Sequence, residues 1–264
     1  MISVLLPVRD PDLRHLSTAI DSVLRSSVDD LELLVVEDMR TAGVLAVLEN
    51  CHDARIRHVI DGIGNGLGAA LNAGIAAARS GLIARMDADD VCEPERFAKQ
   101  IAMFSADPNL TVAGSQLTII DGAGEVIGLR TYPTTHDEIA ETLTRYNCLA
   151  HSSVMFRKDA VERIGGYATR ALAEDYDLWC RLLLSGARLA NHSEALVRYR
   201  FHAGALKHRT VRPALRATIA LKKRYFSGRL GWRARTRLVA EQALILLPPR
   251  VVIRLFALTA YQRP

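Results

Sequence analysis

The chain has 264 residues, 49% hydrophobic and 24% charged, which is enough for one large domain with a normal core. It contains no run of 18 uninterrupted apolar residues, and its opening MISVLLPVRD lacks the basic leader of a signal peptide, so we expect a cytoplasmic protein without a spanning helix. The charge is divided unevenly, because residues 198–264 hold 16 of the 34 Lys and Arg residues but one of the 29 acids. This division predicts two regions with different partners.

The first forty residues alternate between apolar runs and an amphipathic pattern. Residues 2–8 (ISVLLPV) predict a buried strand that Pro7 helps to end, and residues 31–38 (LELLVVED) predict a second strand. The segment between them carries apolar side chains at helical spacing, namely Leu13, Leu16, Ile20, Val23 and Leu24. This order indicates a βαβ unit with a parallel sheet, in which ligands usually bind at the carboxyl ends of the strands.

The alternation continues to residue 90. We expect a third strand at 56–60, a helix opened by the Gly-rich segment 63–81, and a fourth strand in LIARM at 82–86. The Gly-rich segment is not a dinucleotide fingerprint, because Ala69 stands where the third glycine of G-x-G-x-x-G is needed. Polar side chains follow three of the strands, and we expect them at one edge of the sheet: Arg9 and Asp10, Glu37 and Asp38, and the aspartates of 87–90.

The second half of the chain is predicted to be mixed. A helix is expected over residues 94–108, and a hairpin over 111–120 and 125–132 around the turn DGAG. Further helical patterns follow, at 136–145, 158–164 and 174–186.

Asp87, Asp89 and Asp90 place three carboxylates within four positions. Like charges this close raise one another's pKa unless solvent or a cation relieves them. One interpretation is a solvated loop, or an acidic N-terminus for the helix after Pro94. The other is a Mg²⁺ or Mn²⁺ site that also binds phosphate oxygens. The spacing alone leaves both open.

Five segments, in the correct order, resemble family 2 glycosyltransferases of the GT-A fold. They cover about residues 2–204 and read SVLLPVRD, VVED, IARMDADDVCEPERFAKQ, HSSVMFRKDAVERIGGY with AEDYDLWCRLLLSG, and LVRYRFH. The resemblance implies a Rossmann-like α/β domain over 1–204, with a mainly parallel central sheet flanked by helices, and a C-terminal helical appendage over 205–264. It also implies metal-dependent, inverting transfer of a sugar from a nucleotide sugar, expected to be a UDP-sugar. The acceptor would be a hydroxyl of a saccharide or lipid-linked saccharide, in cell-surface polysaccharide or glycolipid synthesis.

The resemblance further implies roles on the donor side. Asp38, with Glu37 beside it, would contact the base, and Pro7 and Arg9 would line the nucleotide pocket. Asp87 would hold the ribose or share the metal. The residue expected to coordinate the Mn²⁺ or Mg²⁺ that bridges the two phosphates is Asp89.

On the acceptor side the resemblance points to Asp175 as the catalytic base, with Glu174, His151 and Trp179 as acceptor contacts. It adds His202 as a metal ligand. Other interpretations stay open: the acids at 174–177 would complement a helix dipole, Trp179 would be a core residue, and His202 an ordinary surface histidine.

Two short segments differ from the family pattern. Residues 64–67 read Gly-Asn-Gly-Leu, in which the asparagine is displaced by one, and Met39-Arg40 replaces the usual Gly-Ser. Both lie near the expected nucleotide pocket, which leaves the identity of the base open.

The basic region 205–264 suits amphipathic helices. Arg229, Arg233 and Arg237 share one helical face, residues 222–224 are all basic, and the apolar runs are split at Pro248 and Pro249. Such helices lie on anionic membrane surfaces, so we expect a peripheral protein on the inner face of the membrane. Nucleic acid is not an expected partner, because few aromatic residues accompany the basic ones. A protein partner, or packing on the catalytic domain alone, would also fit.

Two other classes of protein would share parts of this pattern. A sugar-phosphate nucleotidyltransferase would need a second basic clamp, but no lysine-rich loop follows the first strand. A noncatalytic nucleotide-sugar-binding assembly protein would keep the fold without the chemistry, and substitution of Asp175 would separate it from an enzyme.

Overall fold

The structure is a computed structural model that describes residues 1–61, 64–169, 172–201, 211–228, 230–259 and 262. In this part of the chain the strands are β1 (Ile2–Val8), β2 (Leu31–Glu37), β3 (Ile56–Ile60), β4 (Leu82–Arg85), β5 (Val91–Cys92), β6 (Leu110–Ile120), β7 (Val126–Arg130), β8 (Met155–Arg157) and β9 (Arg188–Arg200). The helices are α1 (Leu13–Leu24), α2 (Val44–Cys51), α3 (Leu67–Ala77), α4 (Arg96–Ala106), α5 (His136–Leu143), α6 (Lys158–Arg163), α7 (Glu174–Leu184), α8 (Val211–Phe226), α9 (Trp232–Leu244) and α10 (Pro249–Thr259), with a 3₁₀ turn at His151–Ser153.

The strands form one sheet in the order β3-β2-β1-β4-β8-β6-β9-β5, and β7 pairs with β6 outside this order. β1 runs parallel to β2 and β4, and β2 runs parallel to β3, which confirms the predicted βαβ arrangement. Beyond β4 the sheet is mixed, because β8 is antiparallel to both β4 and β6 whereas β9 is parallel to β6. The expectation of a mainly parallel sheet therefore holds for its first four strands. The predicted hairpin of β6 and β7 is also confirmed.

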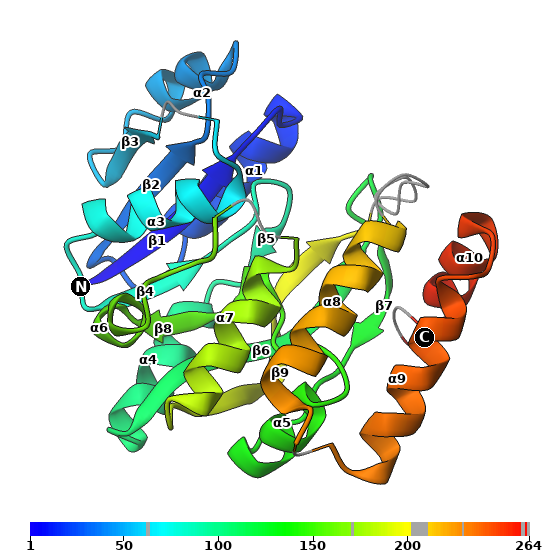
Figure 1. Ribbon diagram of the computed structural model, residues 1–264. Helices are drawn as coiled ribbons and strands as arrows, with labels where there is room; N and C mark the ends of the chain where they lie inside the picture. The colour runs from blue at the N-terminus through cyan, green and yellow to red at the C-terminus, as the bar shows by residue number, and fades with distance from the viewer. Residues whose placement is uncertain (62–63, 170–171, 202–210, 229, 260–261, 263–264) are drawn as a thin grey trace.

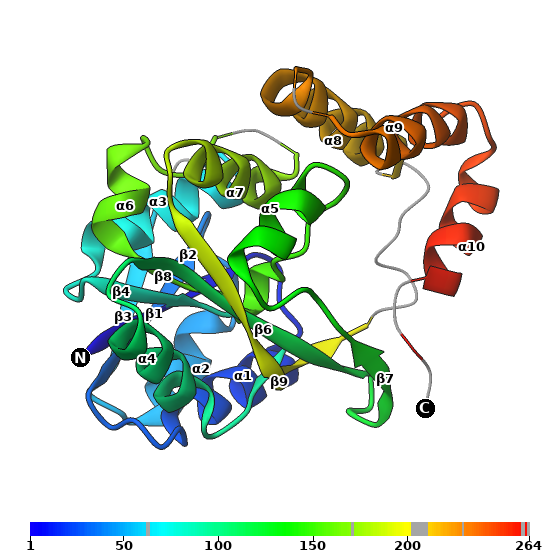
Figure 2. The ribbon, with the colours of Figure 1, turned by 90° about the horizontal axis from the view of Figure 1, so that it is seen from below.

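Helices cover both faces of the sheet (Figure 2). On β1 the side chains alternate: Ile2, Val4 and Leu6 belong to an apolar cluster with α1, α2 and α4, whereas Leu5 belongs to a cluster with α3, α5 and α7. This double burial explains why the first strands are continuous apolar runs. Gly74 brings α3 close to the sheet, because a Cβ there would lie 3.0 Å from the Val36 side chain.

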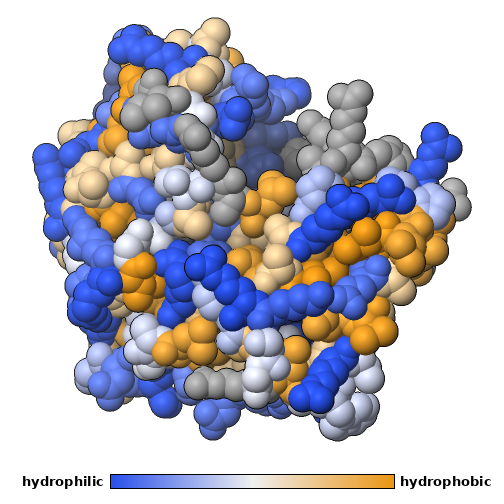
Figure 3. Space-filling view, viewed as in Figure 1, coloured by the Kyte–Doolittle hydropathy of each residue, from blue (hydrophilic) through white to orange (hydrophobic). Residues whose placement is uncertain are grey.

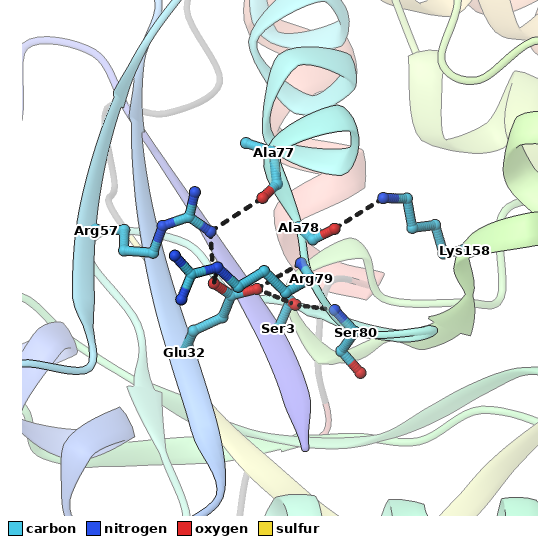
Figure 4. A network of polar contacts seen from close by, with 8 residues as sticks. All are labelled: Ser3, Glu32, Arg57, Ala77, Ala78, Arg79, Ser80 and Lys158. Carbon is cyan, nitrogen blue, oxygen red and sulfur yellow. Dashed lines mark hydrogen bonds and ion pairs between the residues drawn. The ribbon is translucent and has the colours of Figure 1, made fainter.

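A polar network fastens the amino-terminal edge of the parallel strands (Figure 4). Buried Glu32 accepts hydrogen bonds from Ser3 Oγ, the Arg79 amide and Arg57 Nη1, each at 2.6 Å. Although burial opposes ionisation, these three donors lower the pKa of Glu32. Lys158 Nζ donates to the C-cap carbonyl of α3 at 2.8 Å. These contacts fix the amino-terminal edge internally, whereas the polar side chains that follow β1, β2 and β4 lie at the opposite edge.

The last three helices lie together on one side of the molecule, where α9 and α10 pack on α8 (Figures 1 and 2). α8 packs on α7, and its Phe226 belongs to the apolar cluster on that face of the sheet. One basic residue that was predicted to face outwards is instead buried: Lys222 lies against Glu241 with an N–O distance of 2.5 Å. Arg237 stays exposed, and its guanidinium lies over the ring of Tyr146. No helix among the described residues is long and apolar enough to cross a membrane. The proposed boundary at 204/205 and Arg229 fall outside the described residues.

Candidate active site

A cleft of about 440 Å³ opens at the carboxyl ends of β1, β2 and β4. Five of the predicted site residues line it, namely Pro7, Arg9, Asp38, Asp87 and Asp89. The first turn of α3, with Leu67 and Ala70, contributes an apolar wall. The prediction that strand ends deliver polar groups to one edge is thus confirmed for β1, β2 and β4.

Asp38 is held at the floor of this cleft. Its Oδ1 accepts a hydrogen bond from the Gly66 amide at 3.3 Å, and its Oδ2 lies 3.4 Å from Arg9 Nη1. Gly66 has φ +92°, a conformation that a side chain would disfavour, so glycine allows the turn before α3 to present its amide. Asp38 is buried whereas the Arg9 side chain is 71% exposed, so the arginine is accessible to an anionic ligand.

Glu37 does not reach the cleft. One carboxylate oxygen accepts from the Thr41 amide at 2.8 Å, and the other lies 2.6 Å from His58 Nε2. The expectation that Glu37 joins Asp38 in binding the nucleotide does not agree with this geometry, because both of its oxygens are engaged with the loop after β2 and with β3. Glu37 shapes that loop instead.

The three aspartates after β4 are brought together as predicted. A carboxylate oxygen from each of Asp87, Asp89 and Asp90 lies within 4.8 Å of the other two. One oxygen of Asp90 accepts from the Arg200 amide at 2.8 Å, and the other is buried without a hydrogen-bond partner. Burial, followed by the charges of Asp87 and Asp89, raises the pKa of Asp90 well above its usual range. A cation would relieve this repulsion.

The residues in this cluster fit a divalent metal. Their oxygens are the hard ligands that Mg²⁺ and Mn²⁺ prefer, and the unpartnered oxygen of Asp90 leaves coordinating capacity in the group. Asp87 and Asp89 face the cleft, whereas Asp90 is 99% buried behind them. The predicted ligand His202 lies outside the described residues.

Asp175 stands in the first turn of α7. Ala173, just before the helix, has φ +61°, a strained conformation of the kind found at functional sites. Asn147 Nδ2 donates to Asp175 Oδ2 at 2.7 Å, and the Tyr176 amide donates to Oδ1 at 2.7 Å. Burial nevertheless raises the pKa of Asp175, and that of Glu174 is raised by burial and by the charge of Asp175. Such a carboxylate is a stronger base than an exposed one.

The predicted acceptor contacts separate into two groups. His151 is half-buried, and its Nε2 lies 2.9 Å from the Tyr167 hydroxyl. Burial and the charge of Arg85 lower the pKa of His151 well below its usual range, so the ring is neutral at pH 7. Trp179 is fully buried in the core cluster, with its ring 6.1 Å from that of His151. A side chain without exposed surface contacts no acceptor, so this position agrees with the core interpretation of Trp179.

Arg85 and Asn147 are site residues that sequence reasoning missed. Arg85 is 3% exposed, its Nη2 lies 2.5 Å from Asp87 Oδ1, and two of its guanidinium nitrogens have no hydrogen-bond partner. Its charge also acts on Asp175, so one buried cation serves both sides of the site. Arg85 could have been identified from the sequence, because it is a lone charged residue in the apolar strand LIARM. Asn147 lies in a loop, and no feature of the sequence around it indicates a place in the site.

Residues 3–165 match the family described as Glycosyl transferase family 2, which is more than half of the chain. The chain belongs to this family. The glycosyltransferase is 35% identical over 207 residues to the O-antigen biosynthesis glycosyltransferase WbnJ of Escherichia coli, a match that covers 76% of this chain and 80% of WbnJ. It is 26% identical to the UDP-Gal:alpha-D-GlcNAc-diphosphoundecaprenol beta-1,3-galactosyltransferase of Escherichia coli, over 76% of this chain and 74% of that protein.

The glycosyltransferase also resembles solved GT-A enzymes in fold. The mannosyltransferase PcManGT from Pyrobaculum calidifontis, solved in complex with GDP-Man and Mn²⁺, superposes with a TM-score of 0.63 at 16% identity, covering 98% of this chain and 80% of that one. This likeness confirms the GT-A fold of the glycosyltransferase.

Proposed function

We propose that this glycosyltransferase transfers a sugar, with inversion, from a UDP-sugar to a hydroxyl of a saccharide or lipid-linked saccharide in the synthesis of a cell-surface polysaccharide. The observation that carries the proposal is the placement of Asp38, Asp87 and Asp89 in one cleft, with Asp90 buried behind the other two aspartates. Arg85, which pairs with Asp87, also lowers the pKa of Asp175 through its charge. The names of the two Escherichia coli relatives support the class of acceptor.

Separate residues bind the donor and activate the acceptor. Asp38 and Arg9 orient the nucleoside diphosphate, with the exposed arginine over its phosphates. Asp175 removes the proton of the acceptor hydroxyl, and the acceptor oxygen forms its bond to the anomeric carbon. The bond from that carbon to the diphosphate oxygen breaks on the opposite face, and the nucleoside diphosphate leaves with the electron pair. Attack from the opposite face inverts the configuration.

Asp89 and Asp87 would hold Mn²⁺ or Mg²⁺. When bound, such a cation acts as a Lewis acid that neutralises charge on the departing diphosphate. Arg85 keeps one oxygen of Asp87 in place, which leaves the other oxygen for the ligand.

The donor and the metal are tested together by thermal-shift titration with UDP, GDP, CDP and dTDP, each with Mn²⁺, Mg²⁺ or EDTA. A ligand that binds only the folded protein raises its melting temperature by mass action. We expect a shift with UDP that disappears in EDTA. A larger shift with another nucleotide would contradict the assignment of UDP, and a UDP shift that survives EDTA would contradict the metal.

The C-terminal helices support a further part of the proposal, namely attachment to an anionic membrane surface. Trp232 and Val239 are spaced by seven residues and so share one face of α9, and Leu246 lies in the turn that follows the helix. They are 72%, 64% and 83% exposed, whereas Glu241 on the opposite face is buried. Figure 3 displays apolar surface interleaved with hydrophilic side chains on the right, where these helices lie. With 16 basic residues and one acid in 198–264, the surface complements anionic lipid.

The membrane contact is tested by sedimentation with phosphatidylglycerol-containing vesicles. The double variant Trp232→Ser/Leu246→Ser removes apolar surface from α9 and the turn after it, and Leu45→Ser/Val126→Ser removes two other exposed apolar side chains, 52% and 56% exposed, from elsewhere. We expect the first variant to sediment several-fold less than the unaltered protein and the second to sediment equally. Equal sedimentation of both variants would contradict attachment through α9.

A further inference from the structure

The layer of C-terminal helices contacts the two segments that hold Asp175. Asp175 is fixed from one side by the start of α7 and from the other by Asn147, which donates to its Oδ2 at 2.7 Å. Each of these segments is contacted by a different C-terminal helix, and the contacts are polar and specific.

The contact with α7 comes from α8. The Tyr225 hydroxyl donates to Asp177 Oδ1 at 2.7 Å, two residues after Asp175. The other oxygen of Asp177 accepts from Arg181 Nε at 2.8 Å, and Arg181 also binds the carbonyls of Ile164 and Gly166. Asp177 is 5% exposed, so this network is largely shielded from water. The hydroxyl of Tyr225 thus completes the hydrogen bonding of the first turn of α7.

The contact with the Asn147 segment comes from α9. The guanidinium of Arg237 lies 4.6 Å from the centre of the Tyr146 ring, the residue directly before Asn147. Glu241 holds Arg237 in this position, because Glu241 Oε1 accepts a hydrogen bond from Arg237 Nε at 3.0 Å. Glu241 is fixed in turn by Lys222 of α8 at 2.5 Å. The buried Glu241 therefore connects α8 to α9 and holds the guanidinium of Arg237 over the loop that carries Asn147.

We propose that Tyr225 and Arg237 are positioning residues for the transfer step, which hold Asp175 and Asn147 in register with each other. The inference rests on the proposed function, because it takes Asp175 as the base. It gives the C-terminal region a role in the reaction itself, in addition to any membrane contact. Small displacements of a reacting group are costly, since a misplacement of about 1 Å can lower a rate by about a hundred-fold.

The test compares Tyr225→Phe, Arg237→Met and Arg237→Lys in the full chain. Phenylalanine removes only the hydroxyl, methionine removes the cation, and lysine keeps a cation over Tyr146. Arg163→Met is the matched control, because Arg163 also pairs with an acid four positions away, Asp159 at 2.7 Å, and is 69% exposed. Asp175→Asn removes the proposed base, and it therefore tests the proposed function separately from the positioning roles.

Two measurements are made on each protein. The first is kinetic: the rate of UDP release from UDP-galactose is measured with water or an N-acetylglucosaminide as acceptor. The affinity for UDP in the presence of Mn²⁺ is measured on the same protein. The second is a ¹³C NMR titration of the Asp175 carboxyl, assigned with Asp175→Asn, which needs no substrate. Burial opposes the ionised form of Asp175 and raises its pKa, as does the neighbouring charge of Glu174, whereas the Tyr176 and Asn147 donors and the charge of Arg85 favour the ionised form.

We expect kcat to fall by about ten-fold in Tyr225→Phe and Arg237→Met with unchanged UDP affinity, and the Asp175 carboxyl to titrate at higher pH in both. Arg237→Lys should recover most of the rate, and Arg163→Met should match the unaltered protein. Unaltered kcat and unaltered titration in both variants would overturn the inference, as would a parallel loss of UDP affinity. Activity that survives Asp175→Asn would instead overturn the proposed function.

Discussion

The donor side and the acceptor side of this glycosyltransferase are built in different ways. On the donor side, Asp38 directly follows β2 and Asp87 comes two residues after the end of β4, and the parallel pairing of the strands with β1 brings them together. On the acceptor side, Asp175 begins a helix, and its partner Asn147 lies 28 residues away in a loop. The donor side is thus set by sheet topology, and the acceptor side by contacts between distant segments.

This difference has a physical consequence for how each side responds to substitution. A strand end in a nine-stranded sheet is fixed by ladders of hydrogen bonds on both sides, so the loss of one side chain changes chemistry rather than position. A helix start held by a few side-chain contacts shifts when one contact is lost. Variants on the donor side should therefore bind the nucleotide and metal more weakly. Variants around Asp175 should instead have a lower kcat with an unchanged affinity for UDP.

The largest effect is expected for Asp89→Asn. The substitution removes a negative ligand from the metal cluster, and a bound cation contributes several kcal/mol to stabilising the transition state. We expect activity to fall by at least about a hundred-fold and the metal-dependent thermal shift with UDP to shrink. The two quantities are measured on the same preparation, by UDP release and by thermal shift.

The matched control is Asp12→Asn, which removes a carboxylate from the same cleft. Asp12 caps α1 through the amides of Arg14 and His15, and asparagine caps a helix equally well. We expect Asp12→Asn to keep its thermal shift. If it lost as much activity as Asp89→Asn, the negative charge of the cleft as a whole, and not a metal site at Asp89, would account for the effect.

A smaller effect, on rate alone, is expected for Asn147→Ala. The amide of Asn147 favours the ionised form of Asp175, whose pKa is raised by burial, so its removal raises that pKa further. The base acts when ionised, and activity is lost as the pH falls through its pKa. The acid limb of the kcat profile should therefore move to higher pH, with UDP affinity unchanged. A limb that stays in place would show that the hydrogen bond does not tune the base.

Sequence patterns predicted the donor side better than the acceptor side, for the same physical reason. The strands up to β4 are apolar because both of their faces are buried, so the pattern marked where each strand ends and which polar group follows it. β8 has only three residues, and β9 alternates irregularly between buried and exposed positions, so neither was predicted. Asn147 and Tyr225 act through contacts across 28 and 48 residues, which no local spacing encodes.

The smallest effect concerns the place where the two sides meet, at Gly68. A Cβ at Gly68, in the first turn of α3 beside the cleft, would lie 2.4 Å from the Ala168 carbonyl oxygen, next to Tyr167 of the acceptor side. Backbone atoms cannot rotate away, so Gly68→Ala must separate the two segments, at a cost of about 1–3 kcal/mol that exceeds the helical preference for alanine. Thermal unfolding should show a lower melting temperature, whereas Gly81→Ala, where the added methyl meets nothing within 4 Å, should leave it unchanged. If Gly68→Ala unfolds like the unaltered protein, the two sides are not in rigid contact at this point, and each would have to be positioned by its own supports alone.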